Sequence, residues 1–211
     1  MPIFPRLCRP LASLALLLCS AVLAPGALAA DDFEDPGFRI RQLDKKFRAD
    51  LAGDSQLKRC QDEALKDYLS GHLGEFLSLH NLITDMAFKL TSERLSDMPE
   101  DRQEKLKAEF AKFIVSDNFA ALKLACSAKK LQILSRDVDF TVSRVETSLQ
   151  PKGRKPVRVN FLLLRGWDKW MVANVGAGQT SLSDKYRELL GPAIATGGYE
   201  GLLNRLINLN M

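Results

Sequence analysis

The sequence predicts an α+β domain in which helices come first, an antiparallel sheet of four strands follows, and two helices complete the chain. Changes in the hydrophobic period carry this prediction. Apolar residues recur at helical spacing from about residue 35 to residue 125, alternate with polar residues from about residue 128 to residue 172, and return to helical spacing after residue 178. A length of 211 residues with 46% hydrophobic residues fits one globular domain.

The first thirty residues are expected to be an export signal and not a part of this fold. Arg6 and Arg9 precede the apolar run Leu11–Val22, and Ala27-Leu28-Ala29 forms a small-x-small cleavage site. We expect residues 1–29 to be removed, so that residues 30–211 form a single domain in the periplasm. The net charge of +4 includes these two arginines, so the exported chain is nearly neutral and nucleic acid is not an expected partner.

Apolar stripes mark the N-terminal helices. The helix with the clearest start follows Met98, because Pro99 suits the first helical position and the acidic Glu100 and Asp101 favour the positive end of the helix dipole. That helix carries Leu106, Phe110, Phe113 and Ile114 on one face. The earlier stripes, in chain order, are Leu43, Phe47 and Leu51; Leu57, Ala64, Leu65 and Tyr68; and Leu73, Phe76, Leu77, Ile83 and Ala87.

The predicted strands are short alternating runs joined by turns. Pro151–Pro156 and Gly166–Lys169 contain the Pro and Gly residues that are typical of turns. Connections this short indicate an antiparallel meander, since parallel strands need a long crossover. The alternating apolar positions are Leu131 and Ile133; Val138, Phe140 and Val142; Val157, Val159, Phe161 and Leu163; and Trp170 and Val172.

Two helices are expected after the sheet. Ser181 is a candidate N-cap for the first of them, and Gly191-Pro192 and Gly197-Gly198 interrupt the helical pattern that follows. The apolar stripes are Leu182, Tyr186, Leu189 and Leu190 before these interruptions, and Leu202, Leu203, Leu206 and Leu209 after them.

The chain contains no catalytic or metal-binding motif. His72 and His80 are its two histidines, and on one helix they would lie about 12 Å apart, which is too far for both to bind one metal ion. Gly176-x-Gly178 lacks the third glycine and the βαβ context of a dinucleotide site. We therefore expect neither an enzyme nor a bound cofactor or metal.

The oxidation state of the cysteines depends on the compartment in which the protein works. Cys60 and Cys126 remain after cleavage of the signal, in an oxidising space where they could form a disulfide. A reduced and buried pair is the alternative.

Several segments of the C-terminal half fit one family pattern. They are Trp170-Met171-Val172-Ala173-Asn174-Val175, Thr180-Ser181-Leu182, Tyr186-Arg187 and Gly198–Leu206. The helix that starts at Pro99-Glu100-Asp101-Arg102 also fits the pattern. This arrangement resembles the MlaC family of periplasmic phospholipid-binding proteins, often called toluene-tolerance proteins. Asn174 stands where the family has Asp, Gly178-Gln179 where it has Glu-Gly, and Lys185 where it has Asn, so the chain resembles a divergent member.

The resemblance implies a curved sheet closed by helices around an apolar cavity that holds phospholipid acyl chains. It also implies a shuttle that works with an outer-membrane lipoprotein complex and an inner-membrane ABC transporter complex to maintain the lipid asymmetry of the outer membrane. The residues expected to line the cavity are Phe110, Ile114, Val142, Val159, Phe161, Leu163, Trp170, Val172 and Tyr186. Each of them could instead pack in an ordinary solid core.

Two other functions fit the same sequence. The first is a carrier of another apolar lipid, such as a hopanoid. The second is an envelope adaptor that carries no lipid and binds another protein. The volume enclosed by the fold separates the adaptor from a carrier, because a drug-sized ligand needs a pocket of roughly 300 Å³ or more.

Overall fold

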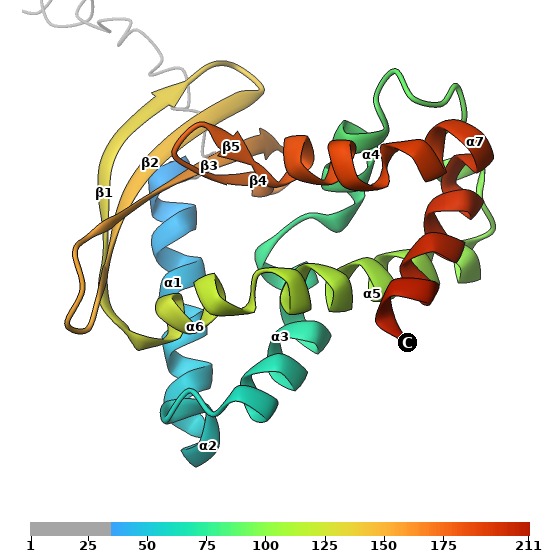
Figure 1. Ribbon diagram of the computed structural model, residues 1–211. Coiled ribbons are helices and arrows are strands. Elements are labelled where there is room, and N and C mark those ends of the chain that lie inside the picture. Colours follow the sequence, from blue (N-terminus) through green and yellow to red (C-terminus); the bar gives the residue numbers. More distant parts are fainter. Residues whose placement is uncertain (1–34) are drawn as a thin grey trace, which may run out of the picture. The chain divides into compact units, whose positions relative to one another are not determined.

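The structure, a computed structural model, describes residues 35–211, and the expected signal peptide lies outside the described residues. Six α-helices come first (Figure 1): α1 Pro36–Gly53, α2 Ser55–Lys58, α3 Asp62–Phe76, α4 Leu79–Ala87, α5 Glu100–Asp117 and α6 Phe119–Ser127. The strands follow as β1 Ala128–Val138, β2 Val142–Pro151, β3 Val157–Arg165, β4 Trp170–Ala177 and β5 Thr180–Ser181, and α7 Leu182–Asn210 ends the chain. None of the helices in residues 35–211 is long and apolar enough to cross a bilayer.

Side-chain caps explain where several helices begin. Asp35 accepts a hydrogen bond from the backbone of Gly37 at the start of α1, and Asp54 does the same for Gln56 and Leu57 in α2. Ser181 caps α7 as predicted, because its hydroxyl accepts from the amide of Asp184. The helix predicted after Met98 is confirmed as α5, although Pro99 sits at the N-cap, one residue before the first helical position.

The predicted α+β fold with an antiparallel sheet is confirmed. Its strands lie in the order β1-β2-β3-β4-β5, each antiparallel to the next, so the four expected strands gain a fifth of two residues at the β4 edge. The positions of the first two strands were partly wrong. β1 runs on to Val138, and Phe140 lies in the turn before β2 with 78% of its surface exposed. The alternation of apolar residues continues through this turn, and it therefore imitates a strand.

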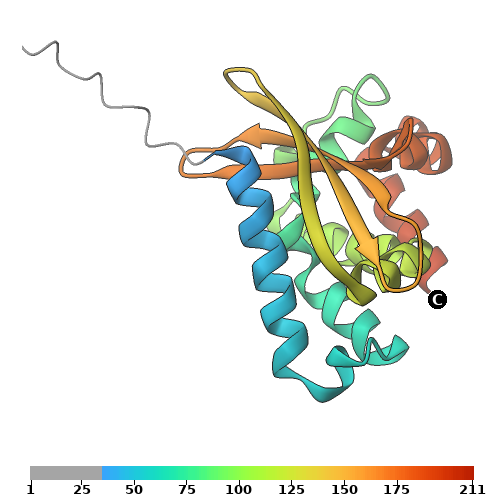
Figure 2. The ribbon, with the colours of Figure 1, turned by 90° about the vertical axis from the view of Figure 1, so that its left-hand side faces the viewer.

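The sheet is strongly twisted. Figure 2 shows the β1–β2 and β3–β4 hairpins pointing in different directions. Pairing is irregular between Ala128 and Lys130, between Ile133 and Ser135, and between Leu162 and Leu163. Irregularities of this kind increase the local twist and bend a strand, which gives the sheet its curvature.

The last helix has one break and not two. Helical geometry continues through Pro192, whereas Gly197 and Gly198 depart from it and divide α7 into two helical parts, as the two predicted helices require. Gly198 has a φ of +56°, and an added Cβ would collide with a carboxylate oxygen of Glu93. The same carboxylate accepts a hydrogen bond from the amide of Tyr199 and so caps the second part of α7.

The helices form a layer with its own apolar core. α5 packs against α3 and α7, and α4 also packs against α7. Contacts with the sheet come from α1 on β1 and β2, from α6 on β2, and from α4 and α7 on β4. The fully buried residues of the helical layer include Leu65, Leu82, Ile83, Leu106, Phe110, Tyr186, Leu190, Leu202, Leu203 and Leu206.

Candidate functional site

One face of the sheet is mostly apolar, and part of it is incompletely covered. We call it the inner face; on β2 it carries Ser143, Val145, Thr147 and Leu149, all of which are buried. Register places Leu163, Phe161 and Val159 of β3 beside them on the same face. Leu163 is fully buried, but Phe161 and Val159 are only half-buried.

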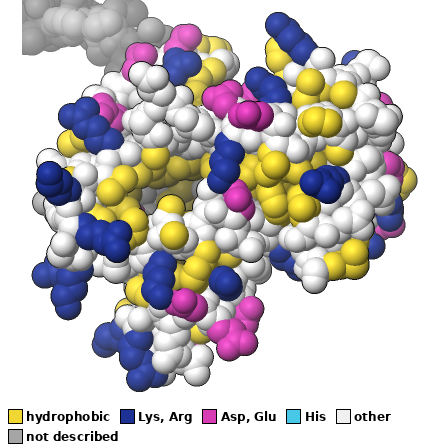
Figure 3. All heavy atoms as spheres, viewed as in Figure 1, with side chains coloured by type: hydrophobic (Ala, Val, Ile, Leu, Met, Phe, Trp, Pro, Cys, Tyr) yellow, Lys and Arg dark blue, Asp and Glu magenta, His cyan; other side chains and the backbone are white. Residues whose placement is uncertain are grey.

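The same partial exposure continues onto β1, where Leu131 and Ile133 pair with the inner-face residues Leu149 and Thr147. The opposite face of β2 carries Arg144, Glu146, Ser148 and Gln150, which is the polar pattern of a face in water. Figure 3 shows a hollow in the surface with hydrophobic side chains along its wall. The structure therefore has apolar surface that its own helices leave partly uncovered.

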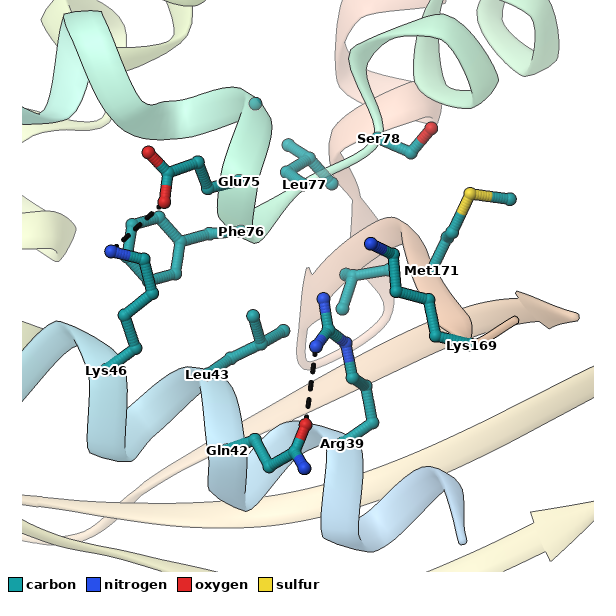
Figure 4. A pocket seen from close by; sticks show the side chains of 12 residues that line it. Arg39, Gln42, Leu43, Lys46, Glu75, Phe76, Leu77, Ser78, Lys169 and Met171 are labelled. Atoms are coloured by element: carbon teal, nitrogen blue, oxygen red, sulfur yellow. Dashed lines mark hydrogen bonds and ion pairs between the residues drawn. The ribbon is translucent and has the colours of Figure 1, made fainter. Parts of the chain in front are cut away.

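A pocket of about 540 Å³ lies between α1, the end of α3 and the start of β4. We call it the α1–β4 pocket. Its apolar side chains are Leu43, Phe76, Leu77, Met171 and Val172, and its charged side chains are Arg39, Lys46, Glu75 and Lys169 (Figure 4). Apolar walls with a few charged groups are typical of a site for an amphiphilic ligand.

Local structure explains how these elements meet. Arg39, Gln42, Leu43 and Lys46 recur at the spacing of one helical face on α1. α3 ends at Phe76, and the amide of Ser78 then donates a hydrogen bond of 2.7 Å to the carbonyl of Val172. The segment after α3 thus covers an edge of β4 and holds Leu77 at the pocket.

One end of the pocket is neutralised by the protein itself. The ammonium of Lys46 lies 2.9 Å from a carboxylate oxygen of Asp50 and 3.1 Å from one of Glu75, and the hydrogen bond to Asp50 raises the pKa of Lys46. The hydroxyl of Tyr68 donates to Asp50, which lowers the pKa of that carboxyl. Burial raises the pKa of Tyr68, and the bond to Asp50 adds to this shift.

The predicted wall residues do not all lie in one place. Val159, Phe161 and Leu163 lie on the inner face, and Val172 lines the α1–β4 pocket. Phe110, Ile114 and Tyr186 are packed in the helical core instead, where the rings of Phe110 and Tyr186 are 5.5 Å apart. Trp170 is buried at the start of β4.

The assignment of Val142 to this wall is contradicted by the register of the sheet. Val142 pairs with Leu164, and alternation along β2 places both residues on the face opposite to Val145. The error follows from treating residues 138–142 as one strand, because the turn at residues 139–141 resets which positions face inward.

Most of the residues that line the α1–β4 pocket were not predicted from sequence. Arg39, Lys46 and Lys169 are charged residues among many others, and nothing in the local pattern distinguishes them. The available signal was the mixed basic and apolar stripe of α1, in which Leu43 stands between Arg39 and Lys46.

Cys60 and Cys126 form a disulfide, with an S–S distance of 2.01 Å and a Cα–Cα distance of 6.0 Å. The bond joins the turn before α3 to α6. Since α6 packs against β2, the disulfide links the N-terminal helices to the part of the chain that leads into the sheet.

Comparison with known proteins identifies relatives of this chain. The model of the family described as MlaC protein matches residues 54–208. A solved structure, the phospholipid-binding protein from Ralstonia solanacearum in complex with a phospholipid, has a similar fold with a TM-score of 0.67 at 16% sequence identity. The match covers 84% of this chain and 97% of that chain, whereas no curated protein matches the sequence. Because the family model spans most of its length, the chain belongs to the MlaC family.

Proposed function

We propose that this protein is a lipid carrier that holds the acyl chains of a phospholipid along the inner face of the sheet and its headgroup at the α1–β4 pocket. The observation that carries the proposal is the apolar inner face, where Val159 and Phe161 are left half-buried by the rest of the fold. The membership in the MlaC family and the phospholipid bound by the Ralstonia solanacearum protein support the choice of ligand.

The energetics favour this arrangement over binding through polar contacts. Each CH₂ group of an acyl chain moved into water costs about 0.8 kcal/mol, so two chains of about sixteen carbons cost on the order of 25 kcal/mol. An apolar wall replaces the bilayer for these chains without fixed hydrogen bonds. A carrier with such a wall can release its lipid when another apolar surface is offered.

The proposed site of action is the periplasm. The signal peptide expected in residues 1–29 would export the chain, and the disulfide between Cys60 and Cys126 suits an oxidising compartment. There the protein would shuttle lipid between an outer-membrane lipoprotein complex and an inner-membrane ABC transporter complex. The test is transfer of labelled lipid from the loaded protein to liposomes with and without the reconstituted transporter of the same host; equal rates would contradict the partnership.

The binding function is tested by isolating the exported protein and identifying its ligand. Native mass spectrometry should show one phospholipid molecule per chain, and the emptied protein should extract phospholipid from vesicles. A hopanoid in its place would identify the other carrier function. Repeated absence of lipid, with no uptake from vesicles, would leave the adaptor as the better hypothesis.

A charge placed on the inner face should prevent lipid binding. In Val159→Lys the ammonium would enter the apolar space, and because burying a charge without a partner is costly, uptake of phospholipid should fall at least tenfold. Val142→Lys is the matched control, since Val142 is also half-buried but lies on the opposite face of the sheet. Circular dichroism checks that both variants fold, and equal uptake by the two variants would exclude the inner face as the lipid site.

A further inference from the structure

Two cations face one another across the α1–β4 pocket. Figure 4 shows the guanidinium of Arg39, on α1, and the ammonium of Lys169, in the turn before β4, pointing toward each other. They come from elements far apart in the sequence, and apolar Leu43, Leu77 and Met171 stand around them.

Neither cation is neutralised in the way that Lys46 is. The hydrogen bond found for Arg39 runs from its Nη1 to the uncharged side chain of Gln42 at 3.4 Å. Its Nε atom is buried and has no hydrogen-bond partner among the described residues. For Lys169, the ion pair found among residues 35–211 is with its neighbour Asp168, whose carboxylate is exposed and lies 3.9 Å from the ammonium.

An anion would stabilise this arrangement. Two like charges that share a pocket repel one another, although only weakly where one of them, Lys169, has 49% of its side chain exposed, and an oxyanion between them would replace this repulsion with attraction. An oxyanion between the two side chains would accept hydrogen bonds from the Nη atoms of Arg39 and would pair with the ammonium of Lys169. Arginine is suited to phosphate because its planar fork donates two parallel hydrogen bonds.

We propose that Arg39 and Lys169 bind the phosphate of the lipid headgroup. This inference rests on the proposed function and assigns two residues to the headgroup contact, so that the site would select lipids that carry a phosphodiester over neutral lipids with the same acyl chains. The apolar neighbours favour a phosphate attached to hydrocarbon over free phosphate. Arg39 precedes residues 54–208, so the family match does not itself assign this role to it.

The experiment compares two lipids that differ in the phosphate group. The emptied protein is incubated with vesicles that contain labelled phosphatidylglycerol or labelled diacylglycerol, and the lipid extracted per chain is measured. Wild type should retain phosphatidylglycerol at least tenfold better than the double variant Arg39→Gln, Lys169→Gln. The two proteins should retain diacylglycerol equally, because it lacks the phosphate.

Matched controls remove charges that do not line the pocket. Lys45→Gln changes the exposed side of α1, and Lys152→Gln changes the exposed turn between β2 and β3. Both variants should bind phosphatidylglycerol like wild type. An equal loss in these controls would show a general effect of net charge at the anionic vesicle surface and would overturn the proposal.

The remaining outcomes separate the two proposals. In the first case wild type takes up both lipids, and the double variant either takes up both equally well or loses uptake of both to the same degree. The phosphate site is then wrong and the carrier function stands. If wild type takes up neither lipid, the carrier function fails and this inference fails with it. A ³¹P titration with inorganic phosphate tests whether the site binds a free anion. If wild type binds inorganic phosphate but retains phosphatidylglycerol no better than diacylglycerol, the site binds a free anion and not a lipid headgroup.

Discussion

At the scale of the residue, Tyr186 shows how a family-pattern residue serves the fold. Its hydroxyl donates to a carboxylate oxygen of Asp117 at 3.0 Å and accepts from the side-chain amide of Asn118. Lys185, beside it, pairs with the same Asp117. The ring packs in the core against Phe110 and Phe113 of α5. Tyr186 therefore holds α7 against α5 and does not line the candidate lipid site.

Removing this hydroxyl should alter stability in a pH-dependent way. Burial raises the pKa of Tyr186 above its ordinary value of about 10, so above that pH the unfolded chain releases a proton that the folded chain keeps. Stability is therefore fully present below about pH 10 and falls as the pH rises further. Tyr186→Phe should lose about 1–2 kcal/mol at pH 7, the cost of a broken buried hydrogen bond, and should show a shallower alkaline decline.

Urea unfolding at pH 7 and between about pH 9 and pH 11 measures both effects. Tyr68 and Tyr199 keep part of the decline in the variant, since burial raises their pKa values as well. An alkaline slope identical to that of wild type would show that the Tyr186 hydroxyl ionises as it does in the unfolded chain.

At the scale of the element, the sequence predicts whether a segment is a helix, strand or turn better than it predicts the residues at which the segment begins and ends. Capping by Ser181 and the turns at Pro151–Pro156 and Gly166–Lys169 could be predicted locally, because each depends on a few neighbouring residues. Phe140 could not be placed, since an apolar residue in a turn continues the alternation of the strands. Pro192 was misjudged because α7 accommodates the proline without leaving helical geometry.

The candidate site was harder to predict for a related reason. The inner-face positions Val159, Phe161 and Leu163 follow from alternation along one strand, and they were predicted on that basis. The pair Arg39 and Lys169 exists only because α1 lies across from the start of β4. Contacts of this kind depend on tertiary arrangement, which no local period encodes.

The disulfide is a covalent cross-link between the turn before α3 and α6, the helix that leads into the sheet. It closes a loop with a sequence separation of 66 residues, and the chain-entropy relation gives a stabilisation of about 4 kcal/mol for a loop of this length. The double variant Cys60→Ser, Cys126→Ser should therefore lose up to about 4 kcal/mol. Thermal unfolding with and without dithiothreitol measures this: the reductant should lower the Tm of wild type and leave the variant unchanged, whereas an unchanged wild type would show that the loop is held by packing alone.

At the scale of the whole molecule, stability is divided between a filled layer and an unfilled face. The helical layer around Leu106, Tyr186 and Leu203 is fully buried, so it can keep its shape with or without a ligand. The inner face has half-buried apolar side chains and bends through irregular strand pairing. We infer that this division lets the fold persist while lipid enters and leaves.

In the proposed carrier function, the apolar space beside Val159 and Phe161 that would hold acyl chains is also volume that disappears when the chain unfolds. Hydrostatic pressure favours the state of smaller volume, and the volume change of unfolding grows with the voids that are eliminated. Emptied protein should therefore show a more negative volume change of unfolding than protein loaded with phospholipid, whose acyl chains occupy the void. High-pressure fluorescence of the two forms would measure it; identical volume changes would mean that the lipid lies elsewhere. A lipid carrier of this kind would thus be unfolded by pressure more easily in its empty form than in its loaded form.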